Sequence, residues 1–219
     1  MASDSGMSEL QALGARSVPI VSKGSTFVSA QVIRDVAEFL GLDEDTGPKL
    51  SPTALAERYQ IVLDKAVSLT AQMPDECLMR ELPNRPRSWR VLMHHVFQIP
   101  TAYLDMEDTG EIMTYEEMVA PPPDHLQTSA DIATFGAEVA SRFSAWWEAD
   151  TTRSYTDEVP TYFGGTTRHE MLERVVWHST QHVRQVTSLL EQAGVTPKNP
   201  LTRADLADLP LTEHVWDEN

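Results

Sequence analysis

The sequence contains a single cysteine, Cys77, among its 219 residues. One thiol cannot form an internal disulfide framework or a cysteine-based zinc cluster, so neither device holds this chain together. Long apolar runs are also lacking, because no stretch approaches the roughly 20 residues needed to cross a bilayer. The N-terminus shows no charged and then apolar signal pattern. These features predict a cytoplasmic protein that does not associate with membranes.

Basic residues are scarce. Lysine and arginine total 17 against 33 aspartates and glutamates, which gives a formal net charge of −16. Nucleic acids and anionic membrane surfaces are bound through basic patches, so both are disfavoured as partners. A small-molecule substrate is the expected partner.

Several catalytic motifs are missing as well. The sequence has no glycine-rich phosphate loop, no nucleophile elbow and no zincin His-Glu-x-x-His. The pair His169-Glu170 lacks a second histidine at the zincin spacing, and Cys77 has no neighbours that indicate a reactive thiolate. The chemistry of this chain has to come from other residues.

What the sequence does contain is helical periodicity. Ser51 followed by Pro52 is a strong start signal for a first long helix. Thr167 and Glu170 form a capping box before the last one, which Gly194 ends. Pro100 is expected to bend or interrupt the second helix. The predicted long helices span about 52–72, 88–106, 129–150 and 167–193. Four amphipathic helices of this length predict an all-α fold, a four-helix bundle.

The bundle is predicted to occupy residues 49–195. Residues 1–48 are expected to hold a disordered start (1–16), an extended segment over 18–28 and a short helix over 30–40. Residues 196–219 are expected to form an irregular C-terminal tail that packs on the body, anchored by Val215 and Trp216. The long connection between the second and third helices favours one crossover.

The last long helix carries two histidines four residues apart, His178 and His182. This spacing places both imidazoles on one helix face, where they can reach a single metal ion. At about 100° per residue, both lie at the edge of the apolar arc and are predicted to point obliquely into the bundle. A pair alone does not make an open metal site, which needs three protein ligands.

The second helix offers the third ligand. His95 lies in the middle of its apolar face, whereas His94 lies to one side and is a candidate for a surface position or a supporting contact. Three neutral imidazoles leave a coordination position open, as a catalytic divalent site requires. The alternatives are a chance surface pair on the last helix and hydrogen-bonded core histidines without a metal.

Two stretches resemble the DinB-like metal proteins, a superfamily that includes bacillithiol transferases and mycothiol-dependent maleylpyruvate isomerases. The first is Trp89-Arg-Val-Leu-Met-His-His-Val96, which is similar to their second-helix motif. The second is Glu173-Arg-Val-Val-Trp-His-Ser-Thr-Gln-His-Val-Arg-Gln185, which is similar to their last bundle helix. The resemblance covers about residues 50–193 and implies a four-helix bundle.

The resemblance also implies a divalent metal held by one histidine of the second helix and a His-x₃-His pair. Matched residue by residue, these ligands are His95, His178 and His182, with His94 as the neighbour that makes the first position ambiguous. The implied metal is Zn²⁺ or Ni²⁺, with Fe²⁺ or Mn²⁺ as alternatives, because three-histidine sites accept all four. A low-molecular-weight thiol is the implied cosubstrate.

Further residues are candidates for contacts with the ligands or the substrate. Gln181 and Glu173 are candidates to accept the non-ligating N–H of the histidines. Arg184 is interpreted either as a surface salt-bridge partner or as a binder of a substrate anion. The candidates for contact with the substrate or the ligands, besides Glu173, are His94, Trp177, Gln181, Arg184 and Tyr162.

Three hypotheses about function follow. The first is a metal-dependent enzyme of the thiol S-transferase type, which conjugates, isomerises or dehalogenates a small electrophile with a low-molecular-weight thiol. The second is a non-enzymatic metal-binding or stress-response bundle that acts through protein interaction. The third assigns the histidines a purely structural role. A homodimer is expected, because the bundle carries extra apolar segments and dimers are the commonest oligomers.

Overall fold

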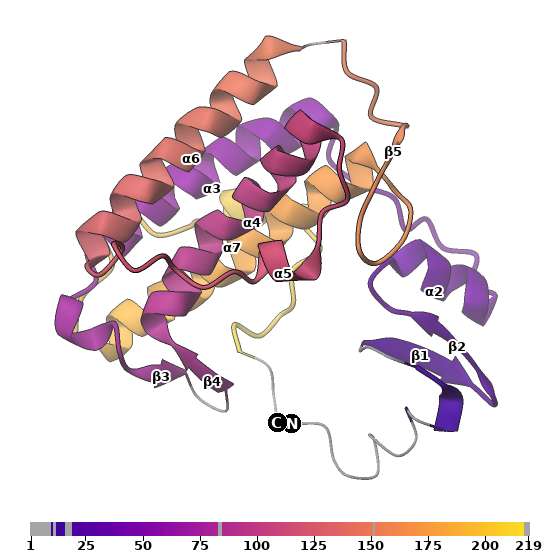
Figure 1. Ribbon diagram of the computed structural model, residues 1–219, viewed down its shortest axis with the longest axis horizontal. Coiled ribbons are helices and arrows are strands. Elements are labelled where there is room, and N and C mark those ends of the chain that lie inside the picture. Colours follow the sequence, from indigo (N-terminus) through magenta and orange to yellow (C-terminus); the bar gives the residue numbers. More distant parts are fainter. Residues whose placement is uncertain (1–9, 11, 16–18, 83–84, 151, 217–219) are drawn as a thin grey trace.

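The structure is a computed structural model that describes residues 10, 12–15, 19–82, 85–150 and 152–216. Four long helices form a bundle, so the predicted all-α, four-helix architecture is confirmed (Figure 1). α3 and α4 each pack against both α6 and α7, and the consecutive helices α3 and α4 are therefore diagonal neighbours. The helices are α3 (Pro52–Thr70), α4 (Trp89–Thr109), α6 (Ser129–Ala149) and α7 (Arg168–Gln192).

The connection between α4 and α6 is a crossover. Arg90, near the start of α4, donates to the backbone oxygen of Leu126, just before α6 begins. Farther along both helices, Arg142 pairs with Asp105 at 2.7 Å. The two helices therefore run side by side in the same direction. Residues 110–128, which connect the end of α4 to the start of α6, return along the length of the bundle, as Figure 1 shows. This loop contains α5 (Tyr115–Met118).

Helix ends follow the local signals in the sequence. The Ser51 hydroxyl accepts the N–H of Ala54 at the start of α3. Thr167 and Glu170 form the predicted capping box at the start of α7. These contacts satisfy backbone N–H groups that have no partner within the helix.

The expected interruption at Pro100 does not occur, because α4 is continuous from Trp89 to Thr109. Proline lacks an N–H, so the carbonyl of Val96 loses its usual helical donor. The hydroxyl of Ser179 on α7 donates to this carbonyl at 3.1 Å instead. The helix continues because a neighbouring helix supplies the missing donor.

The N-terminal part is more ordered than an extended segment. β1 (Ile20–Lys23) and β2 (Thr26–Ser29) form an antiparallel hairpin, and Gly24 takes the left-handed conformation (φ 65°) that its tight turn requires. α2 (Ile33–Leu40) follows and ends at Gly41, as predicted. The unit contacts the bundle through an ion pair of 3.1 Å between Arg34 and Glu170. Most of the predicted disordered start, 1–16, and Val18 lie outside the described residues.

Among the described elements, two further small hairpins, the short helices α5 and α8 and one 3₁₀ turn were not predicted. Strands of two to four residues carry too little alternation to be read from a sequence. A 3₁₀ turn at Asp75–Cys77 lies between α3 and the β3–β4 hairpin, and α8 lies in the C-terminal tail. The elements are β3 (Glu81–Leu82) with β4 (Arg85–Ser88), β5 (Glu158–Val159) with β6 (Thr166–Thr167), and α8 (Arg203–Leu206).

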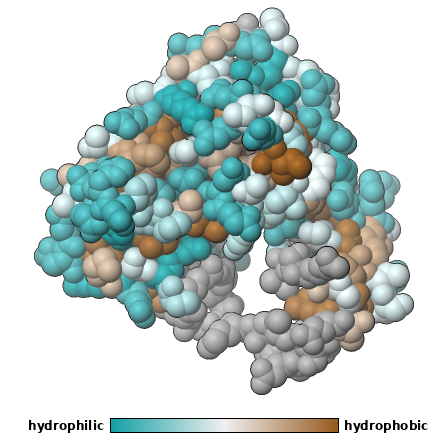
Figure 2. All heavy atoms as spheres, viewed as in Figure 1, coloured by the Kyte–Doolittle hydropathy of each residue, from teal (hydrophilic) through white to brown (hydrophobic). Residues whose placement is uncertain are grey.

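The bundle interior is closely packed and apolar. The largest fully buried side chains include Tyr59, Tyr103 and Phe97, and Cys77 is buried as a free thiol. At Gly136 on α6, an added Cβ would lie 2.5 Å from the Phe97 ring, so α4 and α6 meet through a contact that only glycine permits. Hydrophilic side chains cover most of the face seen in Figure 2. No described helix is long and apolar enough to span a membrane.

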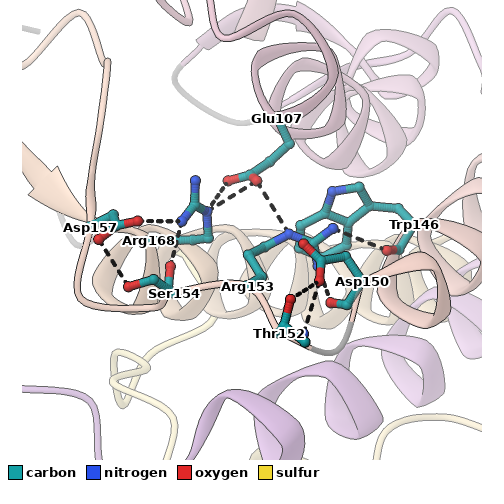
Figure 3. Close-up of polar contacts among 8 residues, drawn as sticks. All are labelled: Glu107, Trp146, Asp150, Thr152, Arg153, Ser154, Asp157 and Arg168. Atoms are coloured by element: carbon teal, nitrogen blue, oxygen red, sulfur yellow. Dashed lines mark hydrogen bonds and ion pairs between the residues drawn. The ribbon is translucent and has the colours of Figure 1, made fainter.

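One end of the bundle is fixed by a buried carboxylate. The Glu107 side chain is 3% exposed and accepts from Nε of Arg168 through both oxygens, at 3.0 and 3.1 Å. Arg153 lies on its other side at 3.8 Å (Figure 3). Arg168 also donates to the carbonyl of Ser154. The cluster joins the end of α4, the start of α7 and the loop that follows α6.

We predict that Glu107→Gln lowers the free energy of unfolding by about 3 kcal/mol, because it removes the buried counter-charge of two largely buried guanidinium groups and leaves Arg168 only the exposed Asp157 at 3.8 Å. Urea denaturation monitored by circular dichroism measures this change. The matched control is Asp105→Asn, which breaks an exposed pair with Arg142 and should cost less than about 1 kcal/mol. Equal effects of the two substitutions would contradict the structural role of the cluster.

Candidate metal centre

Three histidines from two helices meet inside the bundle. His95 lies on α4, and His178 and His182 lie one turn apart on α7. Each offers one ring nitrogen, and these nitrogens all lie within 4.8 Å of one another. Ring centroids are separated by 5.4 Å for His95 and His178, 5.0 Å for His95 and His182, and 4.9 Å within the α7 pair. The structure thus brings together the three residues that the sequence nominated as ligands.

A hydrogen bond next to the candidate ligands fixes how α4 and α7 align along each other. Ser179 follows His178, and its hydroxyl donates to the carbonyl of Val96, which follows His95. Since the one hydroxyl hydrogen of Ser179 is used there, the Tyr59 hydroxyl is the donor in its 2.8 Å contact with Ser179. Three helices are therefore tied together at one buried point. This tie holds the His95 backbone opposite that of His178.

His95 is buried on the inner face of α4. Burial is the main cause that lowers the pKa of His95 to about 2, followed by neighbouring His182 and Arg87, whereas the backbone of Met118 in α5 acts in the opposite direction. The His95 ring is therefore neutral at pH 7.

His178 is the partly exposed member of the three. Burial of the ring is the main cause that lowers its pKa well below the usual value, followed by His182 and His95. A neutral imidazole is the form that binds metal ions.

His182 is held by Gln185, not by Gln181. Nδ1 of His182 lies 2.7 Å from Oε1 of Gln185. Gln181 instead donates to the carbonyls of His214 and Val215 in the C-terminal tail. The predicted contact between Gln181 and a histidine was therefore wrong. The i, i+3 spacing that brings Gln185 to His182 was present in the sequence.

Glu173 also has a different partner from the one predicted. Its carboxylate accepts from the backbone of Lys49, and burial raises its pKa. Arg184 donates to the carbonyls of Thr212 and Glu213. Neither a surface salt bridge nor an anion explains Arg184, because its guanidinium binds the C-terminal tail.

His94 lies to one side of the cluster, as the helical-face argument predicted, but it is not on the surface. Its side chain is buried and stacks on Phe135 with ring centroids 5.2 Å apart and an interplanar angle of 17°. Burial lowers its pKa to about 4. The expected surface position was wrong because α6 covers this side of α4.

A series of ring contacts leads away from the exposed side of the cluster. Trp177 lies against His178 with centroids 5.5 Å apart. Arg174 lies between Trp177 and Phe163, with its guanidinium carbon 5.9 and 4.4 Å from their rings. Tyr162 packs edge-on against Phe163 at 4.9 Å. Trp177 and Tyr162 are thus connected to the site, Tyr162 through intervening side chains.

Sequence reasoning missed Arg87 and Arg174 around the site, and it did not choose Gln185 as the partner of His182. Gln185 bonds His182, and Arg87 and Arg174 are close enough for their positive charges to lower the pKa of His178. Arg174 lies four residues before His178, so its position on the same helix face could have been inferred. Nothing in the sequence places Arg87, on β4, beside α7.

The donor set fits a divalent ion. Nitrogens within 4.8 Å of one another share a point no more than about 2.8 Å from each, whereas Zn–N bonds measure about 2.0–2.1 Å. Side-chain shifts of under about 1 Å therefore close the site. The cluster offers three protein ligands, the number that catalytic zinc sites have, whereas structural sites have four.

Comparison with known proteins agrees with this geometry. The sequence model of the DinB family matches residues 51–207, which run from the cap of α3 to the end of α8. A search of curated proteins finds no match to the chain.

We predict that His95→Ala, His178→Ala and His182→Ala each weaken metal binding by on the order of 100-fold or more, since even the loss of a supporting contact costs about 10–100-fold. Competition with a chromophoric chelator measures the affinity. His94→Phe keeps the contact with Phe135 and should bind metal within about twofold of the parent. A loss in His94→Phe as large as in the other three would contradict the assignment.

We also predict that the metal-free protein loses stability as the pH falls below about 6.5. The pKa values of His94 and His95 are about 4 and about 2 in the folded protein, so both rings stay neutral while the unfolded chain takes up protons. Between pH 6.5 and 4, each contributes a slope of about 1.4 kcal/mol per pH unit. Their contribution is complete above pH 6.5.

Urea unfolding of chelator-treated protein at a series of pH values measures this slope. His94→Phe should reduce it by about 1.4 kcal/mol per pH unit. An unchanged slope in this variant would show that His94 is not held neutral by burial.

Proposed function

Since the chain belongs to the DinB family, whose sequence model covers residues 51–207, we propose that it is a divalent-metal-dependent enzyme of the thiol S-transferase type. It would join a low-molecular-weight thiol to a small electrophile, or use such a thiol to isomerise or dehalogenate one. The observation that carries this proposal is the cluster of His95, His178 and His182, whose ring nitrogens lie within 4.8 Å of one another.

The proposed reaction needs a sulfur nucleophile at neutral pH. A divalent ion, when bound, supplies acidity: it lowers the pKa of a thiol or polarises a substrate carbonyl. In a substitution, the thiol proton passes to solvent, a C–S bond forms, and the leaving group departs with its electron pair. In an addition, the electrophile takes up a proton in place of losing a group.

The residues of the chain support this chemistry by position and charge. His95 and His182 are buried, whereas His178 is partly exposed. Trp177 and the ring contacts beyond it provide apolar contact area on the side of His178. The charges of Arg87 and Arg174 act on His178 and favour an anionic group nearby, which a thiolate is.

The proposed metal is Zn²⁺ or Ni²⁺, with Fe²⁺ or Mn²⁺ as alternatives set by supply. The proposed location is the cytoplasm, where low-molecular-weight thiols are kept reduced. A protein with one buried cysteine, Cys77, offers no competing accessible thiol among its described residues.

We predict that metal-loaded protein consumes a low-molecular-weight thiol in the presence of a matching electrophile. A panel of thiols against haloaromatic, epoxide and maleyl-type electrophiles, followed by loss of free thiol and by mass spectrometry of the adduct, tests this. The His95→Ala protein is the control and should lose the metal-dependent rate at least about 100-fold.

Failure of every pair with fully metal-loaded parent protein would overturn the enzymatic proposal. Metal binding without turnover would favour the non-enzymatic bundle that acts through protein interaction. Parent protein that binds no metal would leave the histidines a structural role only.

A further inference from the structure

The C-terminal tail lies along α7 beside the histidine cluster. Five hydrogen bonds to tail carbonyls hold residues 212–215, and they come from side chains one turn or less apart on α7. Trp216 adds a bond from Nε1 to the Ser188 hydroxyl at 3.2 Å. The donors of the carbonyl bonds are Gln181, Arg184 and Gln185.

One of these donors also touches a metal-ligand candidate. Gln185 donates from Nε2 to the Val215 carbonyl at 3.0 Å, and its Oε1 lies 2.7 Å from Nδ1 of His182. A backbone carbonyl can only accept, so the amide nitrogen has to face Val215. The amide oxygen then faces His182, and Nδ1 of His182 has to carry the hydrogen.

This orientation determines which nitrogen of His182 can bind an ion. With Nδ1 protonated and bonded to Gln185, the lone pair of the neutral ring resides on Nε2. Contacts of this kind fix the tautomer and orientation of a ligating histidine and raise its basicity. Among the described residues, the hydrogen-bond partners of the Gln185 amide are Val215 at its nitrogen and His182 at its oxygen.

We propose that the C-terminal tail is part of the metal centre: the Val215 carbonyl orients Gln185, and Gln185 holds His182 as the Nδ1–H tautomer for metal binding. Gln185 is a positioning residue that acts through His182. The inference rests on the three-histidine site of the proposed function. The family match ends at residue 207, so the tail contact is a feature of this chain outside the matched region.

Metal affinity tests the proposal. A chain that ends at Leu211 and the Gln185→Ala variant should each bind Zn²⁺ about 10–100-fold more weakly than the parent in chelator competition. Truncation in the Gln185→Ala background should cause no further loss, because both changes remove the same contact. Gln185→Glu keeps an acceptor for Nδ1–H and should stay within about threefold of the parent with or without the tail.

The matched control is Gln72→Ala. Gln72 also binds backbone after α7, with bonds to both the carbonyl and the N–H of Lys198, but it contacts no histidine. Its loss should leave Zn²⁺ affinity within about twofold of the parent. A drop as large as that of Gln185→Ala would mean that general loosening of the C-terminal segment explains the effect.

The tautomer can be read without metal. Long-range ¹H–¹⁵N correlation spectra of the metal-free protein should show His182 as the Nδ1–H form in the parent and in Gln185→Glu. The truncated chain and Gln185→Ala should show a mixture of the two tautomers. This readout also applies if Gln185→Ala binds metal too weakly to measure.

Three results would overturn the proposal. They are an Nε2–H tautomer in the parent, a truncated chain with parental Zn²⁺ affinity, and a further loss of affinity on truncation in the Gln185→Ala background. Each leaves the proposed function intact as long as the parent binds Zn²⁺ through the three histidines. If the parent does not bind Zn²⁺, the proposed function is overturned instead. The tautomer spectrum then still decides whether the tail orients His182.

Discussion

The hydrogen bond from Ser179 to the carbonyl of Val96 is the contact on which the site depends. It exists because Pro100 has no N–H and leaves that carbonyl available to another helix. The bond joins two residues that directly follow His95 and His178, so the same contact that lets α4 continue through Pro100 also fixes α4 against α7. Tyr59, which donates to Ser179 from α3, completes a buried connection among three helices.

Local patterns in the sequence were sufficient to choose the three candidate ligands that the structure brings together. The helical period places His178 above His182 and puts His95 on the inner face of α4, and these relations need no knowledge of the other helices. The pairing of the two faces could not be predicted, since Ser179 and Val96 are 83 residues apart and Pro100 was expected only to bend or interrupt its helix. The same local reasoning placed His94 to one side, but it could not show that Phe135 on α6 covers it.

The contacts around the ligands were harder to predict because they involve irregular backbone. Gln181 directly precedes His182, so their side chains do not face each other on the helix, whereas Gln185 lies at i, i+3 and bonds His182. The path of residues 212–215, whose Val215 carbonyl accepts from both glutamines, could not be predicted from the sequence. Arg184 was interpreted by its charge, whereas its partners are neutral carbonyls of the same segment. The two-residue strands around the bundle ends escaped prediction for the related reason that pairing, not local pattern, defines them.

The central claim is that His95, His178 and His182 together hold one divalent ion in a site with room for a further ligand. X-ray absorption spectroscopy of stoichiometrically Zn²⁺-loaded protein measures this most directly. We expect one ion per chain, bound by three imidazole nitrogens at about 2.0–2.1 Å, with oxygen ligands completing the coordination shell. A spectrum without imidazole multiple scattering, or one fitted by carboxylate and water oxygens alone, would contradict it.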